Sequence, residues 1–88
     1  MYSLEVKQSC QKEIKKLCSK NSVLGKALEK KIKEILVNPN HYKPLKHDLA
    51  GERRVHLLNC FVLKFEINEV NKVVTLIFLG HHDEAYKR

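Results

Sequence analysis

The sequence predicts an α+β fold in which an N-terminal helical hairpin packs on one face of a small, mainly antiparallel four-stranded sheet. Three observations carry this prediction. Apolar residues recur at helical spacing through residues 9–37, they alternate at strand spacing through residues 53–67, and a shorter alternation occupies residues 2–6. The expected element order is therefore β-α-α-β-β-β. A length of 88 residues suits a single domain spanning residues 1–88.

Two amphipathic helices are expected after a first strand that places Tyr2, Leu4 and Val6 on one face. The first helix has Ser9 as its candidate N-cap, and its apolar stripe consists of Cys10, Ile14, Leu17 and Cys18. Asn21 and Ser22 offer a second cap, and the stripe that follows consists of Leu24, Leu28, Ile32, Ile35 and Leu36. Asn38 ends this helix, because Pro39 disfavours helical geometry in the residue before it.

The C-terminal half sorts its side chains between two faces of a sheet. In the middle strand the core face carries apolar residues, namely Phe61, Leu63, Phe65 and Ile67, while Val62, Lys64 and Glu66 point the other way. The preceding strand sends Val55 and Leu57 to the core and Arg54 and His56 to the opposite face. Polar groups able to do chemistry therefore gather away from the core. Residues 73–79 are apolar on both sides, which predicts a central strand covered on both faces and ending at Gly80.

The net charge of +7 favours a polyanion or an acidic protein as partner. The excess is concentrated in residues 1–40, which hold nine lysines and four glutamates. Three cysteines, Cys10, Cys18 and Cys60, form an odd set without C-x-x-C spacing, so we expect buried or partly buried thiols, not a disulfide framework or a zinc finger. No apolar run has the length of a membrane span and no secretory segment opens the chain, so a cytoplasmic protein is expected.

Four segments of the chain form a recognisable series: the helical hairpin ending in Asn38-Pro39, the stretch PLKHDLAGERRVHLLNCFVLKFEI, the strand KVVTLIFLG and the final HHDEAY. Together they resemble the RelE toxins of the RelE/ParE superfamily of toxin–antitoxin systems, and Gly80, His81, His82 and Tyr86 fit the family's ending. The resemblance implies an endoribonuclease that cuts messenger RNA in the ribosomal A site without a cofactor. It also implies contact with ribosomal RNA and silencing by a cognate RelB-like antitoxin, expected to be acidic and helical.

Metal-free cleavage, in which the 2′-hydroxyl attacks the adjacent phosphorus, needs a base, an acid and cations for the phosphorane. Arg54 suits the last task, because its guanidinium stays charged and fits phosphate oxygens. His56 and His82 are the acid and base candidates, with the division between them open. His81 is a third candidate, but adjacent residues of a regular strand face opposite sides, so His81 and His82 cannot both point to the same face. His82 is favoured because Tyr86 lies four residues on, a spacing that brings two side chains together on a helical turn. Tyr86 could stack on a base or hold the 2′-hydroxyl.

One position departs from the family pattern. Many members carry a basic residue directly after the aromatic of the middle strand, where this chain has Val62 after Phe61. Lys64 faces the same side two positions on and is the candidate to supply that charge. Beyond the cleavage site, four basic residues are expected to contact RNA phosphates: Arg53, Lys26, Lys30 and Lys33.

Other functions remain open at this point. His56, His81, His82 and Asp83 are metal-ligand types, but their spacing fixes no coordination set, and we expect no metal. Glu66 and Glu84 could also act as bases, but surface carboxylates beside lysines are interpreted as partners in simple ion pairs. A ParE-like toxin that binds DNA gyrase without catalysis is the main alternative, against which two imidazoles on one face argue. A catalytically weak or inactive relative is the third, indicated by Val62.

Overall fold

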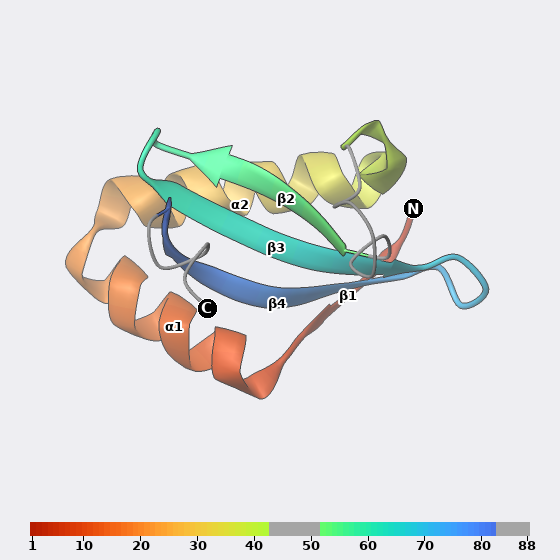
Figure 1. Cartoon of the computed structure of the whole chain (residues 1–88), viewed down its shortest axis with the longest axis horizontal. Coiled ribbons are helices and arrows are strands. Elements are labelled where there is room, and N and C mark those ends of the chain that lie inside the picture. The colour runs from red at the N-terminus through yellow and green to blue at the C-terminus, as the bar shows by residue number, and fades with distance from the viewer. Residues whose placement is uncertain (43–51, 83–88) are drawn as a thin grey trace.

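The computed structural model describes residues 1–42 and 52–82, which form the predicted α+β arrangement (Figure 1). The elements are β1 (Ser3–Val6), α1 (Gln8–Lys20), α2 (Ser22–Val37), the 3-10 turn η1 (Pro39–His41), β2 (Glu52–Leu57), β3 (Phe61–Asn68) and β4 (Val73–His81). The predicted anchors Pro44, Leu45 and Leu49 and the expected C-terminal helical turn lie outside the described residues. In the described part, no helix has the length and apolar character needed to cross a membrane.

The four strands form one sheet in the order β1-β4-β3-β2. β1 pairs with β4 in parallel, whereas β2 with β3 and β3 with β4 are antiparallel. β4 therefore lies inside the sheet, as predicted. Its side chains Val74, Leu76 and Leu79 are fully buried on the helix side, but Val73, Thr75 and Phe78 on the other face are only half-buried. The expected second cover of this strand is thus partial.

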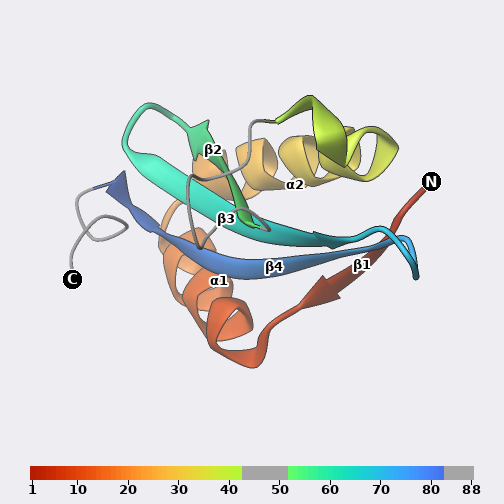
Figure 2. The same ribbon diagram turned by 45° about the vertical axis from the view of Figure 1, so that its right-hand side comes forward.

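The two helices pack against one face of the sheet, with α1 along β4 and α2 along β2 and β3 (Figure 1, Figure 2). Among the described residues one cluster of buried side chains joins the two layers: Cys10, Leu24, Leu28, Ile35, Leu57, Phe61, Leu63, Phe65, Val74, Leu76 and Leu79. Both predicted helical stripes contribute to it, with Ile14, Leu17, Cys18, Ile32 and Leu36 packed around its edge. Burying each large aliphatic or aromatic side chain stabilises the fold by roughly 1.5–3 kcal/mol.

The ends of α2 follow the sequence signals. The Oδ1 of Asn21 accepts a hydrogen bond from the backbone N–H of Leu24 at 3.0 Å, which satisfies a free donor of the first turn. Asn38 is the C-cap, directly before Pro39. The N-cap prediction for α1 is wrong, because Lys7 occupies that position and no side chain caps the helix. The N–H of Lys7 bonds to the carbonyl of Leu76 at 2.9 Å, so the helix begins as soon as β1 leaves β4 and takes Ser9 into its first turn.

One further expectation needs correction. Cys60 is exposed, because it lies in the turn that joins β2 to β3 and not within β3. Leu4 lies beside the buried Val74 on the predicted face but keeps 39% of its surface exposed. It belongs to an edge strand that the helices do not fully cover.

An extra residue interrupts the pairing of β3 with β4. Lys64 pairs with Phe78, but the next residue, Phe65, pairs with Leu76, which leaves Ile77 without an opposing residue. Such a bulge reverses which face the following residues point to. Leu76 faces the core before the bulge, and Leu79 faces it afterwards. The bulge therefore determines which face of the sheet each polar residue at the end of β4 points to.

Candidate functional site

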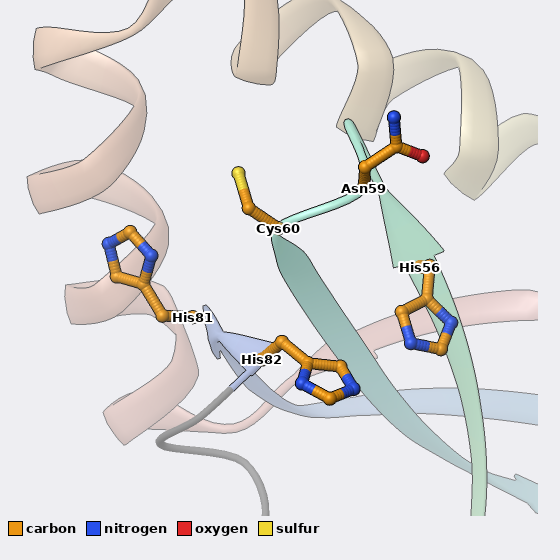
Figure 3. Close-up of a pocket in the computed structure, with 5 residues that line it drawn as sticks. All are labelled: His56, Asn59, Cys60, His81 and His82. Atoms are coloured by element: carbon orange, nitrogen blue, oxygen red, sulfur yellow. The ribbon is translucent and has the colours of Figure 1, made fainter.

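A shallow pocket of about 380 Å³ lies at the end of the sheet where the β2–β3 turn meets the end of β4 (Figure 3). Five residues line it: His56, Asn59, Cys60, His81 and His82. Three of these are the histidines that the sequence singled out. The pocket therefore concentrates imidazole groups from two non-adjacent strands at one place on the surface.

His56 and His82 lie face to face. Their ring centroids are 5.3 Å apart and the ring planes differ by 27°. His56 comes from β2, while His82 follows β4 and is anchored by its backbone N–H, which donates to the carbonyl of Cys60 at 2.8 Å. Both side chains are exposed. Since an imidazole can donate or accept a proton near neutral pH, the pair has the functional groups for acid–base chemistry on a bound ligand.

The bulge in β4 explains why His82 reaches this face. Without an extra residue, the alternation that buries Val74 and Leu76 would continue through Phe78 to His82 and turn His82 toward the helices. With Ile77 unpaired, Phe78 and Gly80 fall opposite Lys64 and Val62 on the outer face of β3. His82 follows in the same phase, on the side of His56.

His81 takes the opposite side of the strand. It pairs in register with Phe61, and its ring lies 4.6 Å from the Phe61 ring, which is 6% exposed. His81 therefore borders the pocket while covering the end of the hydrophobic core, and its ring points away from His82 (Figure 3). The two adjacent histidines thus face different sides, as the strand geometry predicted.

Arg54 and Lys64 lie on the same face as the imidazole pair but outside the pocket lining. They are directly opposite each other in the β2–β3 register, and Arg54 precedes His56 by two residues on β2. The Nζ of Lys64 lies 5.5 Å from the centre of the Phe78 ring, a cation–π distance. Two cations thus follow the pocket along the outer face of the sheet. Tyr86, the remaining predicted member, lies outside the described residues, as do Asp83 and Glu84.

The residues predicted to bind RNA phosphates lie elsewhere. Arg53 faces the helix side, where its Nε donates to the carbonyl of Tyr42 at 3.0 Å and its guanidinium reaches the Oδ1 of Asn40 at 3.4 Å. Three lysines are exposed on α2: Lys26, Lys30 and Lys33. Their helix packs on the face of the sheet opposite the pocket, so any contact they make belongs to a separate surface.

Sequence reasoning missed Asn59 and Cys60. They enter the pocket because the β2–β3 connection is tight, with Leu58 and Asn59 both at positive φ, 52° and 66°. Asparagine tolerates this conformation and is typical of short hairpin turns. The available signal was Asn59 between two alternating apolar segments, only three residues after His56.

The three thiols have different environments. Burial, reinforced by the nearby Glu13 carboxylate, raises the pKa of Cys10 to about 11. Burial also raises the pKa of Cys18, whereas Cys60 is exposed in the pocket wall. Within residues 1–42 and 52–82, no three side chains of His, Cys, Asp or Glu are arranged to hold a metal ion.

Comparison with known proteins places this geometry in a family. The sequence model of the ParE toxin of type II toxin–antitoxin systems (parDE) matches residues 2–86. The chain belongs to the RelE/ParE toxin superfamily. It is 42% identical over 88 residues to a Methanocaldococcus jannaschii protein named "Putative toxin RelE4", covering all of this chain and 94% of that protein.

Solved structures agree with the superfamily fold. The crystal structure of a metal-bound toxin from Helicobacter pylori has a TM-score of 0.80 at 28% identity, covering 98% of this chain and 100% of that one. The toxin in the intact Escherichia coli RelBE toxin–antitoxin complex has a TM-score of 0.76 at 24% identity, covering 91% and 95%. The predicted RelE-like fold is confirmed, and the protein is a toxin of a type II toxin–antitoxin system.

Proposed function

We propose that this RelE/ParE toxin is a ribosome-dependent endoribonuclease that cleaves messenger RNA in the ribosomal A site of the cytoplasm. The observation that carries the proposal is the exposed pair of imidazoles, His56 and His82, whose ring centroids are 5.3 Å apart. Two cations, Arg54 and Lys64, lie on the same face of the sheet. A protein that only binds a partner has no need of such a pair. A nuclease that uses the RNA's own 2′-hydroxyl needs both a proton acceptor and a proton donor.

The proposed reaction is a transesterification. One imidazole takes the proton of the 2′-hydroxyl as its oxygen attacks the adjacent phosphorus, and the other gives a proton to the leaving 5′-oxygen. The P–O5′ bond breaks, leaving a 2′,3′-cyclic phosphate and a free 5′-hydroxyl, and no metal or redox partner is consumed. Arg54 and Lys64 support this reaction electrostatically, since negative charge builds on the phosphorane oxygens. Tyr86 is proposed to stack on the substrate base.

Two further partners complete the proposal. A cognate antitoxin of RelB type, acidic and helical, would neutralise a toxin with a net charge of +7, and the structural neighbours include RelB-bound toxins. The exposed lysines Lys26, Lys30 and Lys33, together with Arg53, are proposed to meet ribosomal RNA phosphates. Such contacts raise affinity in a salt-dependent manner without taking part in bond cleavage.

The test is a translating extract with and without ribosomes, in which purified toxin is added and messenger RNA ends are mapped by primer extension. Ribosome-dependent cuts that carry 2′,3′-cyclic phosphate ends are expected. Adding an excess of the antitoxin should abolish them. Intact messenger RNA in the presence of a toxin that still arrests growth would refute the nuclease function.

DNA gyrase binding is the second candidate, because the matching family model is that of a ParE toxin. It predicts inhibition of gyrase supercoiling by the purified chain, with messenger RNA left intact. A chain with neither effect would be an inactive relative. The two assays on one preparation therefore distinguish all three functions.

A further inference from the structure

Val62 is buried on the face of the sheet that does not carry the core. Its exposed fraction is 0%, yet it is absent from the cluster of eleven buried residues between helices and sheet. Alternation places it with Lys64 and Glu66, which are half-buried and exposed. An apolar side chain fully removed from water on this face needs a cover other than the helices.

The register identifies its neighbours. Val62 pairs with His56 on β2 and with Gly80 on β4, so on the outer face it stands between the strand that carries His56 and the strand that leads to His82. Gly80 is buried as well and has no side chain to fill the space. The two short residues, Val62 and Gly80, therefore lie side by side on the outer face, between the strand that carries His56 and the strand end that leads to His82.

The short distance between the two rings requires a small side chain at the position of β3 that lies between them. β2 and β4 are separated by β3, which corresponds to roughly 9.5 Å between strand axes. The ring centroids of His56 and His82 are nevertheless only 5.3 Å apart, so at least one of the two side chains must lean inward over β3. A long side chain at position 62 would stand between them, because directly opposite side chains on neighbouring strands are in contact.

We propose that Val62 is a positioning residue whose short apolar side chain lets His56 and His82 meet across β3 and act as one acid–base pair. The inference rests on the proposed nuclease function for its catalytic consequence, but its geometric part stands without it. The absence of a basic residue after Phe61 then has a cause in this chain. The space that a cation would occupy is used for ring contact, and the charge is supplied by Arg54 and Lys64 on the same face.

The experiment uses the full chain and two readouts, one independent of RNA. Ring contact is measured by NMR, through nuclear Overhauser effects between the imidazole protons of His56 and His82 and through their ring-current shifts. Cleavage is measured in the ribosomal assay as separate kcat and KM. The variants are Val62→Arg and Val62→Met, with long side chains, and Val62→Thr and Val62→Ala, with short ones. Glu66→Arg adds a cation to the same face of β3 as a matched control.

Both long variants should lose the ring-to-ring Overhauser effect and lower kcat by about 100-fold, since small misplacements of catalytic groups cost about that much, with KM little changed. The Thr, Ala and Glu66→Arg variants should keep the ring contact and a kcat within about threefold. If Val62→Arg does not fold by circular dichroism, Val62→Met decides. Folded long variants that keep the ring contact, or folded short variants that lose it, would overturn the inference. Ring contact that follows the prediction in a chain that cuts no RNA would refute the nuclease function and leave the positioning of the rings intact.

Discussion

The two ends of the sheet carry polar clusters of opposite character. At the β3–β4 turn, the Tyr2 hydroxyl donates to Glu69 at 3.0 Å, the Asn40 amide donates to Glu69 at 3.3 Å, and the Lys72 ammonium lies 3.5 Å from the same carboxylate. At the other end, His56 and His82 contact each other by their ring faces and line an open pocket. The first cluster ties the N-terminus, η1 and a turn together. The second presents titratable groups to whatever enters the pocket.

The comparison separates polar residues that hold the fold from those available to a ligand. Glu69 is contacted by side chains from the N-terminus, from η1 and from its own turn, so its substitution should affect stability and leave chemistry alone. The histidine pair rests on exposed side chains, so its substitution should affect chemistry and leave stability nearly unchanged.

The largest effect is expected for His82→Ala and His56→Ala. Each should lower the single-turnover rate of messenger RNA cleavage by about 10²–10⁴-fold, the usual contribution of a general acid or base. Thermal unfolding followed by circular dichroism and antitoxin binding should both be nearly unchanged. His81→Ala is the matched control, since it removes the neighbouring imidazole from the opposite face. Equal losses in His81→Ala and His82→Ala would refute the assignment by face.

Arg54→Ala should have the next largest effect, a loss of roughly 10- to 100-fold in cleavage rate, because a cation near the phosphorane is removed. Arg54→Lys should restore part of the rate by restoring the charge. Arg53→Ala is the control on the adjacent residue, whose side chain faces Tyr42 and Asn40 instead. We expect it to lower the melting temperature and to leave the cleavage rate at saturating ribosomes unchanged, since a phosphate contact changes affinity and not bond cleavage. A lower cleavage rate for Arg53→Ala together with an unchanged rate for Arg54→Ala would mean that the catalytic guanidinium lies on the helix side of the sheet.

The turn at the pocket end offers a stability test. Leu58 has φ 52°, a conformation that asparagine tolerates and a β-branched residue strongly resists. Leu58→Asn should therefore be more stable than Leu58→Val by roughly 1–2 kcal/mol, measured by urea denaturation of both variants. Their melting temperatures should differ by about 4–8 °C per kcal/mol in a domain of this size. Equal stabilities would mean that the turn adopts another conformation in solution.

The smallest effect is a pH dependence at the scaffold end. Hydrogen bonds from Asn40 and Tyr2, followed by the charge of Lys72, lower the pKa of Glu69 below its ordinary value. A carboxylate with a lowered folded-state pKa stabilises the fold above its unfolded pKa of about 4.3, and this contribution is lost as the pH falls through the lower folded value. Glu69→Gln should therefore lower the melting temperature at pH 7, and the difference from the wild type should vanish in acid. Glu66→Gln, which alters an exposed carboxylate of β3, should lower the melting temperature less at pH 7. A Glu69→Gln difference that persists in acid would contradict this origin.

Local signals were sufficient for α2 and insufficient for the start of α1 and for the end of the sheet. The stripe and caps of α2 depend on residues close in sequence, such as Asn21, Leu24 and Asn38, and they were predicted correctly. Ser9 was misassigned because the start of α1 is fixed by a long-range bond between Lys7 and Leu76. The bulge was invisible because Ile77 and Phe78 are both apolar, so the alternation carries no mark of the slipped residue. The exposure of Cys60 followed from where the hairpin turns.

The unpaired Ile77 has a consequence for comparing this chain with its relatives. Counting residues along β4 at a regular alternation would assign the outward side to His81, because the strand advances by one residue more than its neighbour. Any transfer of roles between toxins by alignment columns alone could therefore exchange two adjacent imidazoles of opposite orientation. A relative of the same length whose β4 alternates without a bulge would turn the residue aligned with His81, and not the one aligned with His82, to the outer face. The bulge at Ile77, more than the residue type at the end of the strand, therefore decides which of the two adjacent rings faces outward.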